Sequence, residues 1–328
     1  MQPETVQMTR DGLRLIPVAY DPFSPGALTA VYQPIPPQQE IWLSCAVGGD
    51  DANKAYNESF SLRISGPLVV QAFEHAFNMV LCEHEALRSS FSRDGRYMMV
   101  YEQANTTLDI LDISGEHSDK QQSVIADYYN RHVDTAFDLE NGPLVRAALF
   151  RLSPTNHFFT FIAHHIVCDG WSLGTVLYFL SKRYNALVGA ESEKLPIPDS
   201  MEAYIREVGE FRNSEDSKKI EQYWISKFAG NVPPPLDLPT DYQRPSRRTY
   251  RSRRADFPLD VSLVNAVKNL GKTHNCSFVT TLLVAYQAFV HRLSGQDDIV
   301  IGLPAADQAA SGYLHLVGHC VNLVPIRS

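Results

Sequence analysis

The stretch His164-His165-Ile166-Val167-Cys168-Asp169-Gly170 determines most of what can be inferred from this sequence. Aromatic and β-branched residues fill positions 157–163 before it, which is typical of a buried strand. Apolar residues recur at helical spacing over positions 173–180, so we expect a helix from Ser172 to Tyr184 with Ser172 as its N-cap. The stretch therefore joins a strand to a helix, and Gly170 is expected to allow a sharp turn of the backbone.

Two adjacent histidines in this position indicate proton-transfer chemistry. Side chains alternate along a strand, so one imidazole can face a cavity while the other packs behind it. A positioned neutral imidazole can accept a proton from an attacking amine or hydroxyl, which accelerates such reactions roughly 100- to 10,000-fold. A pair of packed structural histidines is the alternative for an isolated His-His pair. The Asp-Gly at this spacing, between a strand and a helix, argues for the functional interpretation.

The pattern His-His-x-x-x-Asp-Gly resembles the core motif of condensation domains of nonribosomal peptide synthetases, which belong to the chloramphenicol-acetyltransferase-like superfamily. In the second family motif, Glu83 replaces the usual first arginine and Ser89 replaces threonine. The resemblance covers residues 36–328. Further stretches resemble other motifs of that family in the same order: 38–43, 84–91, 223–224 with 236–245, 301–306 and 317–327.

Several residues indicate which subtype of the family the sequence resembles. The order Asp169-Gly170-Trp171-Ser172 differs from the Asp-Gly-x-Ser-Trp of epimerisation domains, and heterocyclisation domains replace the histidines with aspartate. Gln308 stands where many peptide-type members have arginine. Together with residues 317–322, Gln308 resembles members found in hybrid polyketide–peptide assembly lines.

The resemblance implies an α/β fold with α+β two-layer lobes, in which two chloramphenicol-acetyltransferase-like lobes form a V around the active site. We assign residues 1–35 to a linker rich in proline and glycine, 36–190 to the N-terminal lobe with the His-His motif, and 191–328 to a partial C-terminal lobe. The family fold normally continues past its Asn-x-x-Pro-x-Arg region. We therefore expect the second lobe to be incomplete and to expose apolar surface.

Periodicity predicts individual elements within these lobes. Alternating apolar residues and short apolar runs predict strands at 60–64, 144–152 and 299–301. Apolar residues at helical spacing predict helices at 69–83, 201–211, 218–228, 261–271 and 278–293.

The activity implied by the resemblance is amide-bond formation. A donor acyl, peptidyl or polyketide group would arrive as a thioester on the phosphopantetheine arm of an upstream carrier protein, and an aminoacyl amine on a downstream carrier would attack it. The domain itself would bind no cofactor. Its partners would be the two carrier proteins and adjoining synthetase or synthase modules. Two alternatives stay open: a catalytically silent carrier-binding or recruitment domain of the same fold, and an acyltransferase that forms esters with alcohol acceptors.

The resemblance also assigns roles to the central residues. His165 is the expected catalytic residue, which orients the amine and accepts its proton. His164 is expected to have a structural rather than a catalytic role. Asp169 is expected to form an internal ion pair that shapes the site, with Arg88 as its candidate partner. Gly170 is expected to keep the substrate tunnel open.

Three further residues are candidates for lining the tunnel. Trp171 belongs either to the tunnel wall or to the core. Ser172 either caps its helix, which we favour, or donates a hydrogen bond to the reaction intermediate. Asn322 either faces the acceptor side or is a buried strand-end amide whose partners are backbone groups.

The sequence does not predict a metal site. His164, His165 and Cys168 are close in sequence and are residue types that zinc accepts. However, adjacent strand side chains diverge, and neither Cys-x-x-Cys nor His-Glu-x-x-His occurs.

Composition limits the partners and the compartment. The chain has 328 residues and a formal charge of −8, which argues against nucleic acid or an anionic membrane surface as a partner. Its apolar runs are too short to span a bilayer, and the first residues lack a secretory signal pattern. Five scattered cysteines favour reduced thiols and a cytoplasmic protein.

Overall fold

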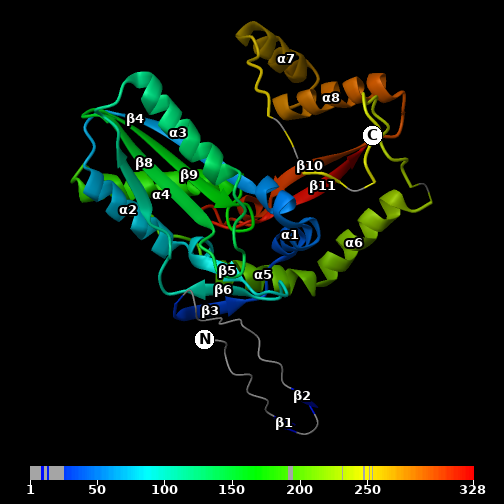
Figure 1. Cartoon of the computed structure of the whole chain (residues 1–328). Coiled ribbons are helices and arrows are strands. Elements are labelled where there is room, and N and C mark those ends of the chain that lie inside the picture. Colours follow the sequence, from blue (N-terminus) through cyan, green and yellow to red (C-terminus); the bar gives the residue numbers. More distant parts are fainter. Residues whose placement is uncertain are drawn as a thin grey trace.

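A four-stranded sheet lies at the centre of the N-terminal part of the chain (Figure 1). In the computed structural model its strand order is β4 (Asn57–Ser65), β9 (Asn156–His164), β8 (Val145–Ser153) and β7 (Leu108–Asp112). The β7–β8 pair is parallel and the other two pairs are antiparallel. The structure describes residues 9–10, 13–14, 26–190, 195–230, 232–246, 248–250, 252 and 254–328. This mixed α/β arrangement agrees with the predicted fold class.

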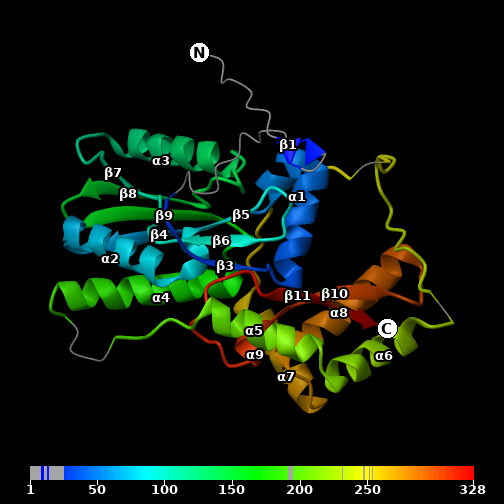
Figure 2. The same ribbon diagram turned by 90° about the horizontal axis from the view of Figure 1, so that it is seen from below.

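Helices cover both faces of this sheet. Helix α3 (Ser118–Val133) lies on one face, and α2 (Val70–Glu83) with α4 (Gly170–Leu187) lies on the other (Figure 2). Phe73 and Phe77 of α2 meet the buried ring of Phe159 edge to face, with ring centroids 5.1 and 6.2 Å apart. Burial of these aromatic rings supplies much of the apolar contact that holds α2 on the sheet.

A smaller sheet corrects the predicted linker. Strands β3 (Leu28–Tyr32), β6 (Met98–Tyr101) and β5 (Ser89–Phe91) pair antiparallel in the order β3-β6-β5. The 3-10 helix η1 (Glu85–Arg88) precedes β5, and helix α1 (Pro36–Ala55) follows β3. The prediction of a linker up to residue 35 is therefore wrong for its last part, because β3 is held in the sheet by β6.

Before residue 26, the structure describes only two short strands of the predicted linker. These are β1 (Thr9–Arg10) and β2 (Leu13–Arg14), which pair antiparallel. Residues 1–8, 11–12 and 15–25 lie outside the described residues.

The C-terminal part combines helices with a two-stranded antiparallel sheet of β10 (Val300–Ala306) and β11 (Val321–Arg327). Its helices are α5 (Met201–Arg212), α6 (Glu215–Phe228), α7 (Val261–Thr273), α8 (Phe278–Ser294) and the short α9 (Asp307–Ala310). The predicted helices are thus confirmed to within a few residues at each end.

Apolar side chains are exposed on the C-terminal part of the chain. On α7 and α8 they include Val261, Leu263, Val279, Val284 and Phe289. On β11, Leu323 is also largely exposed. A pair of helices with so many exposed apolar residues has little core of its own.

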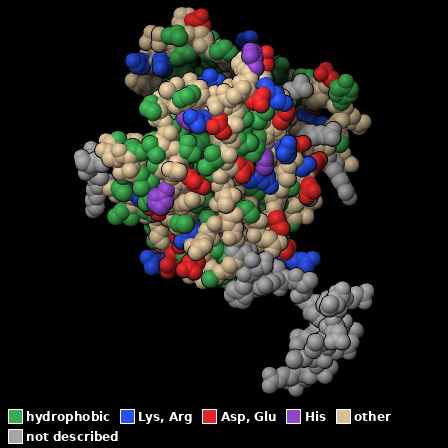
Figure 3. Space-filling model, turned by 60° about the vertical axis from the view of Figure 1, so that its left-hand side comes forward, with side chains coloured by type: hydrophobic (Ala, Val, Ile, Leu, Met, Phe, Trp, Pro, Cys, Tyr) green, Lys and Arg blue, Asp and Glu red, His purple; other side chains and the backbone are tan. Residues whose placement is uncertain are grey.

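Charged side chains of both signs are interspersed on the face shown in Figure 3. The exposed apolar side chains lie between them in separate patches. None of the helices in the described ranges is long and apolar enough to cross a membrane.

Candidate active site

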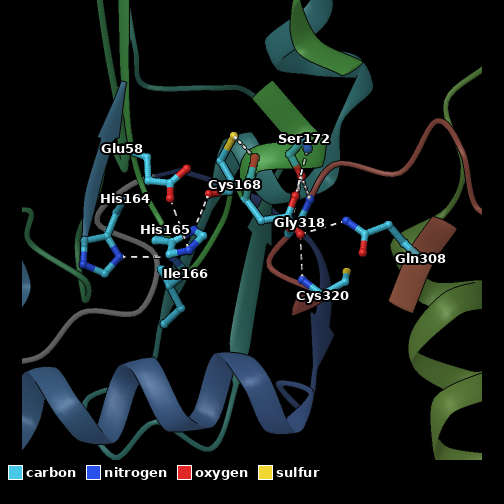
Figure 4. Close-up of polar contacts among 10 residues, drawn as sticks. Glu58, His164, His165, Ile166, Cys168, Ser172, Gln308, Gly318 and Cys320 are labelled. Atoms are coloured by element: carbon cyan, nitrogen blue, oxygen red, sulfur yellow. Dashed lines mark hydrogen bonds and ion pairs between the residues drawn. The ribbon is translucent and has the colours of Figure 1, made fainter. Parts of the chain in front are cut away.

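His165 is held at the end of the central sheet by two hydrogen bonds. Its backbone N–H donates to the carbonyl of Tyr56, at 2.7 Å, and its ring Nδ1 lies 2.9 Å from the carbonyl oxygen of Cys168 (Figure 4). A carbonyl oxygen can only accept a hydrogen bond, so Nδ1 carries the proton. In the neutral ring, Nε2 is therefore the basic nitrogen.

The basic nitrogen of His165 faces a carboxylate that sequence reasoning missed. Glu58, on the neighbouring strand β4, places Oε1 at 3.3 Å from Nε2. The two side chains are only partly covered, with exposed fractions of 21% for His165 and 32% for Glu58. Burial raises the pKa of Glu58, and a positive charge on His165 opposes that rise. Because Nδ1 carries the ring proton, Nε2 and Oε1 are two acceptors 3.3 Å apart, and a donor group placed between them can bond to both.

A second histidine from the C-terminal part packs against this ring. The His319 ring meets the His165 ring edge to face, with centroids 4.4 Å apart and planes at 67°. His319 is buried, and burial together with the nearby His165 lowers its pKa to about 3. It is therefore neutral near pH 7 and restricts the orientation of the His165 ring without adding charge. The sequence contained His319 only as part of a family motif, with no separate indication of this role.

His164 is fully buried, whereas the side chain of His165 is partly exposed. The Nδ1 of His164 accepts a hydrogen bond from the backbone N–H of Ile166, at 3.3 Å. The ring lies near the rings of Tyr56 and Phe137, with centroids 6.1 and 6.0 Å away. Burial, and secondarily His165, lowers its pKa to about 3. These surroundings favour a structural role for His164.

Asp169 connects the His-His loop to the C-terminal part of the chain. The residue is fully buried, and its carboxylate accepts four hydrogen bonds, all from neutral donors. Ser172 donates through N, at 2.8 Å, and its Oγ lies 2.7 Å away. Gln308 donates through Nε2, at 2.7 Å, and Cys320 through its backbone N–H, at 3.1 Å. The loop geometry therefore depends on residues from α9 and from the segment before β11.

The predicted ion pair between Arg88 and Asp169 is wrong. Arg88 lies in η1, just after α2, and its Nε donates to the carbonyl of Cys82, at 2.9 Å, in the last turn of that helix. Its Nη1 reaches Thr29 Oγ1, at 3.2 Å, and the carbonyl of Tyr101. Carbonyls at a helix end lack partners within the helix, so they attract the guanidinium. Among the described residues, no lysine or arginine forms a salt bridge with Asp169.

A scan against family models gives a match to the condensation-domain model over residues 30–328. The chain belongs to the condensation-domain family. The Malpinin synthetase of Mortierella alpina is 31% identical over 293 residues, which are 88% of this chain and 4% of that protein. Surfactin synthase subunit 1 of Bacillus subtilis (strain 168) is 30% identical over 307 residues, which are 93% of this chain and 8% of that protein. The chain thus spans less than a tenth of these relatives.

Solved structures agree with this assignment at the level of the fold. The condensation domain from Monacolin K polyketide synthase superimposes with a TM-score of 0.74 and 19% identity, covering 92% of this chain and 68% of that one. The first condensation domain of the calcium-dependent antibiotic synthetase, in complex with a substrate analogue, gives a TM-score of 0.76 and 21% identity, covering 91% and 70%.

The helix after the motif starts earlier in this condensation domain than the sequence predicted. Asp169, not Ser172, is the N-cap of α4, because the Asp169 side chain accepts a hydrogen bond from the backbone N–H of Ser172. Ser172 is fully buried, and Gly318 N donates to its Oγ at 3.0 Å. The Ser172 hydroxyl has two acceptors for its single proton: Oγ lies 2.7 Å from Asp169 Oδ1 and 2.8 Å from the carbonyl oxygen of Gly318. Ser172 is therefore not a lining residue of a substrate tunnel.

Gly170 does not have the backbone role predicted for it. Its φ is not in the left-handed region, so the turn does not require glycine. A Cβ added at Gly170 would meet no atom within 4 Å, so the position borders open space. Keeping that space free for substrate stays a prediction.

Trp171 and Asn322 lie at the surface and not in the core. Trp171 is 40% exposed, its Nε1 donates to the carbonyl of Leu314, and it borders an apolar groove with Tyr178. Asn322 is exposed on β11 and borders a cleft of about 420 Å³ beside Tyr204. The alternatives of a core Trp171 and a buried Asn322 are therefore wrong, whereas substrate contact by either stays a prediction.

Gln38 on α1 holds the His-His loop in place through its side-chain amide. It is fully buried; its Nε2 donates to the carbonyl of Ile166, at 3.2 Å, and its Oε1 accepts from the N–H of Ile35, at 3.2 Å. Gln38 thus fixes the middle of the loop that carries His165. The sequence contained Gln38 as part of a family motif, without this contact.

We expect Gln38→Leu to lower the free energy of unfolding by about 1–3 kcal/mol, because it leaves a buried carbonyl and a buried N–H without partners. Urea unfolding followed by circular dichroism measures this change. Gln122→Leu, at an exposed position on α3, is the control and should change stability by less than about 0.5 kcal/mol. Equal stability of the two variants would contradict a supporting role for Gln38.

Three buried histidines predict a loss of stability in weak acid. Burial is the main cause that lowers the pKa values of His84, His164 and His319 to about 3. The unfolded chain binds protons at these sites near pH 6.5, so the free energy of unfolding falls as pH decreases from about 6.5 toward 3. Each histidine contributes a slope of up to about 1.4 kcal/mol per pH unit. Urea unfolding at pH 7.5, 6.5 and 5.5 measures the slope. The His164→Asn variant should lose the contribution of one histidine, up to about 1.4 kcal/mol per pH unit. An unchanged slope would contradict the assignment of this pH dependence to the buried histidines.

The thiols and the histidines do not assemble a metal site in the described part of the chain. No group of three or more His, Cys, Asp or Glu side chains there is arranged to hold a metal ion. The five cysteines are free thiols, and Cys45, Cys168 and Cys320 are buried.

Proposed function

We propose that this chain catalyses amide-bond formation between a carrier-bound acyl thioester and an aminoacyl amine. The observation that supports this best is the hydrogen bond from His165 Nδ1–H to the Cys168 carbonyl, which leaves a partly exposed Nε2 as base. A silent recruitment domain would not need an oriented basic nitrogen. The fold alone supports either function.

In the proposed reaction, the amine nitrogen attacks the thioester carbonyl while His165 Nε2 accepts a proton from it. The tetrahedral intermediate then collapses, the carbon–sulfur bond breaks, and the imidazolium returns the proton to the departing pantetheine thiolate. Binding both tethered substrates beside one imidazole removes much of the entropic barrier to their encounter. His164 and Gln38 serve this step by fixing the position of the loop, and no covalent enzyme intermediate is needed.

The partners proposed for this activity are an upstream donor carrier, a downstream acceptor carrier and adjoining modules. Relatives of this chain are much longer synthetases, which supports such a context. The phosphopantetheine arms would belong to the carriers, as parts of the substrates. Gln308 in place of arginine supports a hybrid polyketide–peptide assembly line, and the free thiols agree with the cytoplasmic location inferred above.

A two-carrier assay tests the proposed function. The chain, and a full-length synthetase containing it, are incubated with an octanoyl-loaded donor carrier and a leucyl-loaded acceptor carrier as probes, and products are identified by intact-protein mass spectrometry. We expect octanoyl-leucyl product on the acceptor carrier. Carrier binding without amide product across a panel of acyl and aminoacyl probes would instead assign a recruitment role. Product only with a hydroxyacyl acceptor would assign ester formation.

A further inference from the structure

We propose that Glu58 binds the ammonium form of the acceptor and takes the first of the two protons that amide formation removes. This inference rests on the proposed function of His165 and goes beyond it, because it assigns a second residue and a substrate charge to the site. Glu58 would thereby select amine acceptors over hydroxyl acceptors.

The position of Glu58 supports contact with both His165 and the substrate. It lies on β4 opposite Ala163 of β9, one residue before the His-His pair in the paired strand. Figure 4 shows its carboxylate directed at the His165 ring. Oε1 faces Nε2 at 3.3 Å, whereas Oε2 has no hydrogen bond within the described part of the chain. About a third of the side chain is exposed, so an incoming group can reach Oε2.

The charges around Glu58 favour a cation. The titratable groups that influence it or its partner ring are His165, Asp169, Cys168, His319 and the buried His164. His319 is held neutral, Cys168 is a buried thiol whose pKa is raised, and Asp169 is bonded to neutral donors. No lysine or arginine of the described residues forms a salt bridge with Glu58. A substrate ammonium would supply a positive charge here.

A polar atom of His319 beside the pair is free to bond to the acceptor. His319 Nδ1 is buried and has no hydrogen-bond partner among the described residues, although its ring packs directly on His165. Buried polar atoms in folded proteins normally have partners. A bound acceptor with N–H or carbonyl groups would provide one.

The proton count of the reaction requires a second base. An α-amine has a pKa of about 8, so most of it enters as ammonium near pH 7. Amide formation removes two protons from that ammonium, and the leaving thiolate takes back one. His165 can accept only one proton, because Nδ1 already carries its own and is bonded to Cys168. The carboxylate of Glu58, whose pKa is raised by burial, is the nearest further acceptor.

The proposed reaction conserves atoms and charge at each step. The ammonium gives a proton to Glu58 Oε2 and becomes a neutral amine. The amine forms the carbon–nitrogen bond and gives its second proton to His165 Nε2. The carbon–sulfur bond breaks, Nε2–H protonates the thiolate, and Glu58 releases its proton to water through its exposed side. Overall, ammonium and thioester become amide, thiol and one proton.

An amine acceptor and its hydroxyl analogue, which cannot carry a positive charge, test this inference. In the two-carrier assay, leucyl and 2-hydroxy-4-methylpentanoyl acceptors are compared for wild type, Glu58→Gln and the surface control Glu116→Gln. We expect Glu58→Gln to lower kcat/KM for the amine about 30-fold at pH 7, within the usual range for general-base residues, and less than about threefold for the hydroxyl. The loss should shrink toward pH 9, where the amine is already neutral. Glu116→Gln should leave both rates unchanged.

A binding measurement keeps the test independent of turnover. Calorimetry measures the binding of leucinamide and of 4-methylpentanamide, which lacks the ammonium, to wild type and to Glu58→Gln. The Glu58→Gln substitution should weaken the binding of leucinamide about tenfold and leave the binding of 4-methylpentanamide unchanged. Equal losses for both acceptors and both amides, or no loss at all, would overturn the role of Glu58. If wild type makes no product but leucinamide binding depends on Glu58, the proposed reaction fails and the ammonium site stands.

Discussion

His165→Ala is expected to lower the rate of amide formation by about 100- to 10,000-fold, the usual contribution of a positioned general base. The loss follows from removal of Nε2, which is the basic nitrogen because Nδ1 is bonded to the Cys168 carbonyl. Single-turnover assays with acyl- and aminoacyl-loaded carriers, quenched and analysed by mass spectrometry, measure the rate. Since the ring is partly exposed and makes one ring–backbone hydrogen bond, the fold should survive its loss.

Two controls separate chemistry from folding in this experiment. His117→Ala removes an exposed histidine at the start of α3, far along the chain from the loop, and should leave the rate unchanged. Circular dichroism and urea unfolding should show a folded His165→Ala protein. A folded His165→Ala protein that forms product at the wild-type rate would exclude His165 as the base.

Asp169→Ala is expected to have the largest effect on stability, a loss of about 3–5 kcal/mol. The carboxylate accepts four hydrogen bonds while fully buried, and hydrogen bonds to charged groups contribute about 1.5–3 kcal/mol each, partly offset by the desolvation of the charge. Truncation would leave the donors of Ser172, Gln308 and Cys320 without their acceptor and would remove the N-cap of α4. Urea unfolding measures the loss, and limited proteolysis tests whether residues 307–320 become accessible.

A paired substitution provides the matched control for Asp169. Asp169→Asn turns one acceptor into an N–H₂ group that faces the Nε2 donor of Gln308, so it should also destabilise. Adding Gln308→Glu restores an acceptor opposite that amide and should recover part of the stability. A double variant no more stable than Asp169→Asn would contradict the hydrogen-bonding account. It would favour a requirement for the negative charge itself.

Helices whose buried apolar residues recur at regular spacing were predicted from the sequence, and helices without such spacing were missed. The helix α2 repeats buried Phe73, Phe77 and Val80 on one face, which is why its range was predicted almost to the residue. Helix α3 has no fully buried residue, so its sequence lacks that period. Helix α1 begins with two prolines and contains Gly49 at φ 63°, a left-handed value that interrupts the regular helix. Turn residues inside a helix obscure its pattern.

The sequence by itself determined the family, the strand–loop–helix position of the motif and the presence of one packed and one accessible histidine, because all three follow from local spacing. Only the tertiary structure decided the partners of these residues. Gln308 bonds to Asp169 across 139 positions of sequence, and Glu58 and His319 reach His165 from a neighbouring strand and from the C-terminal part. Local sequence encodes periodicity, whereas a buried carboxylate bonds to whichever donors the packing of distant segments brings within about 3 Å.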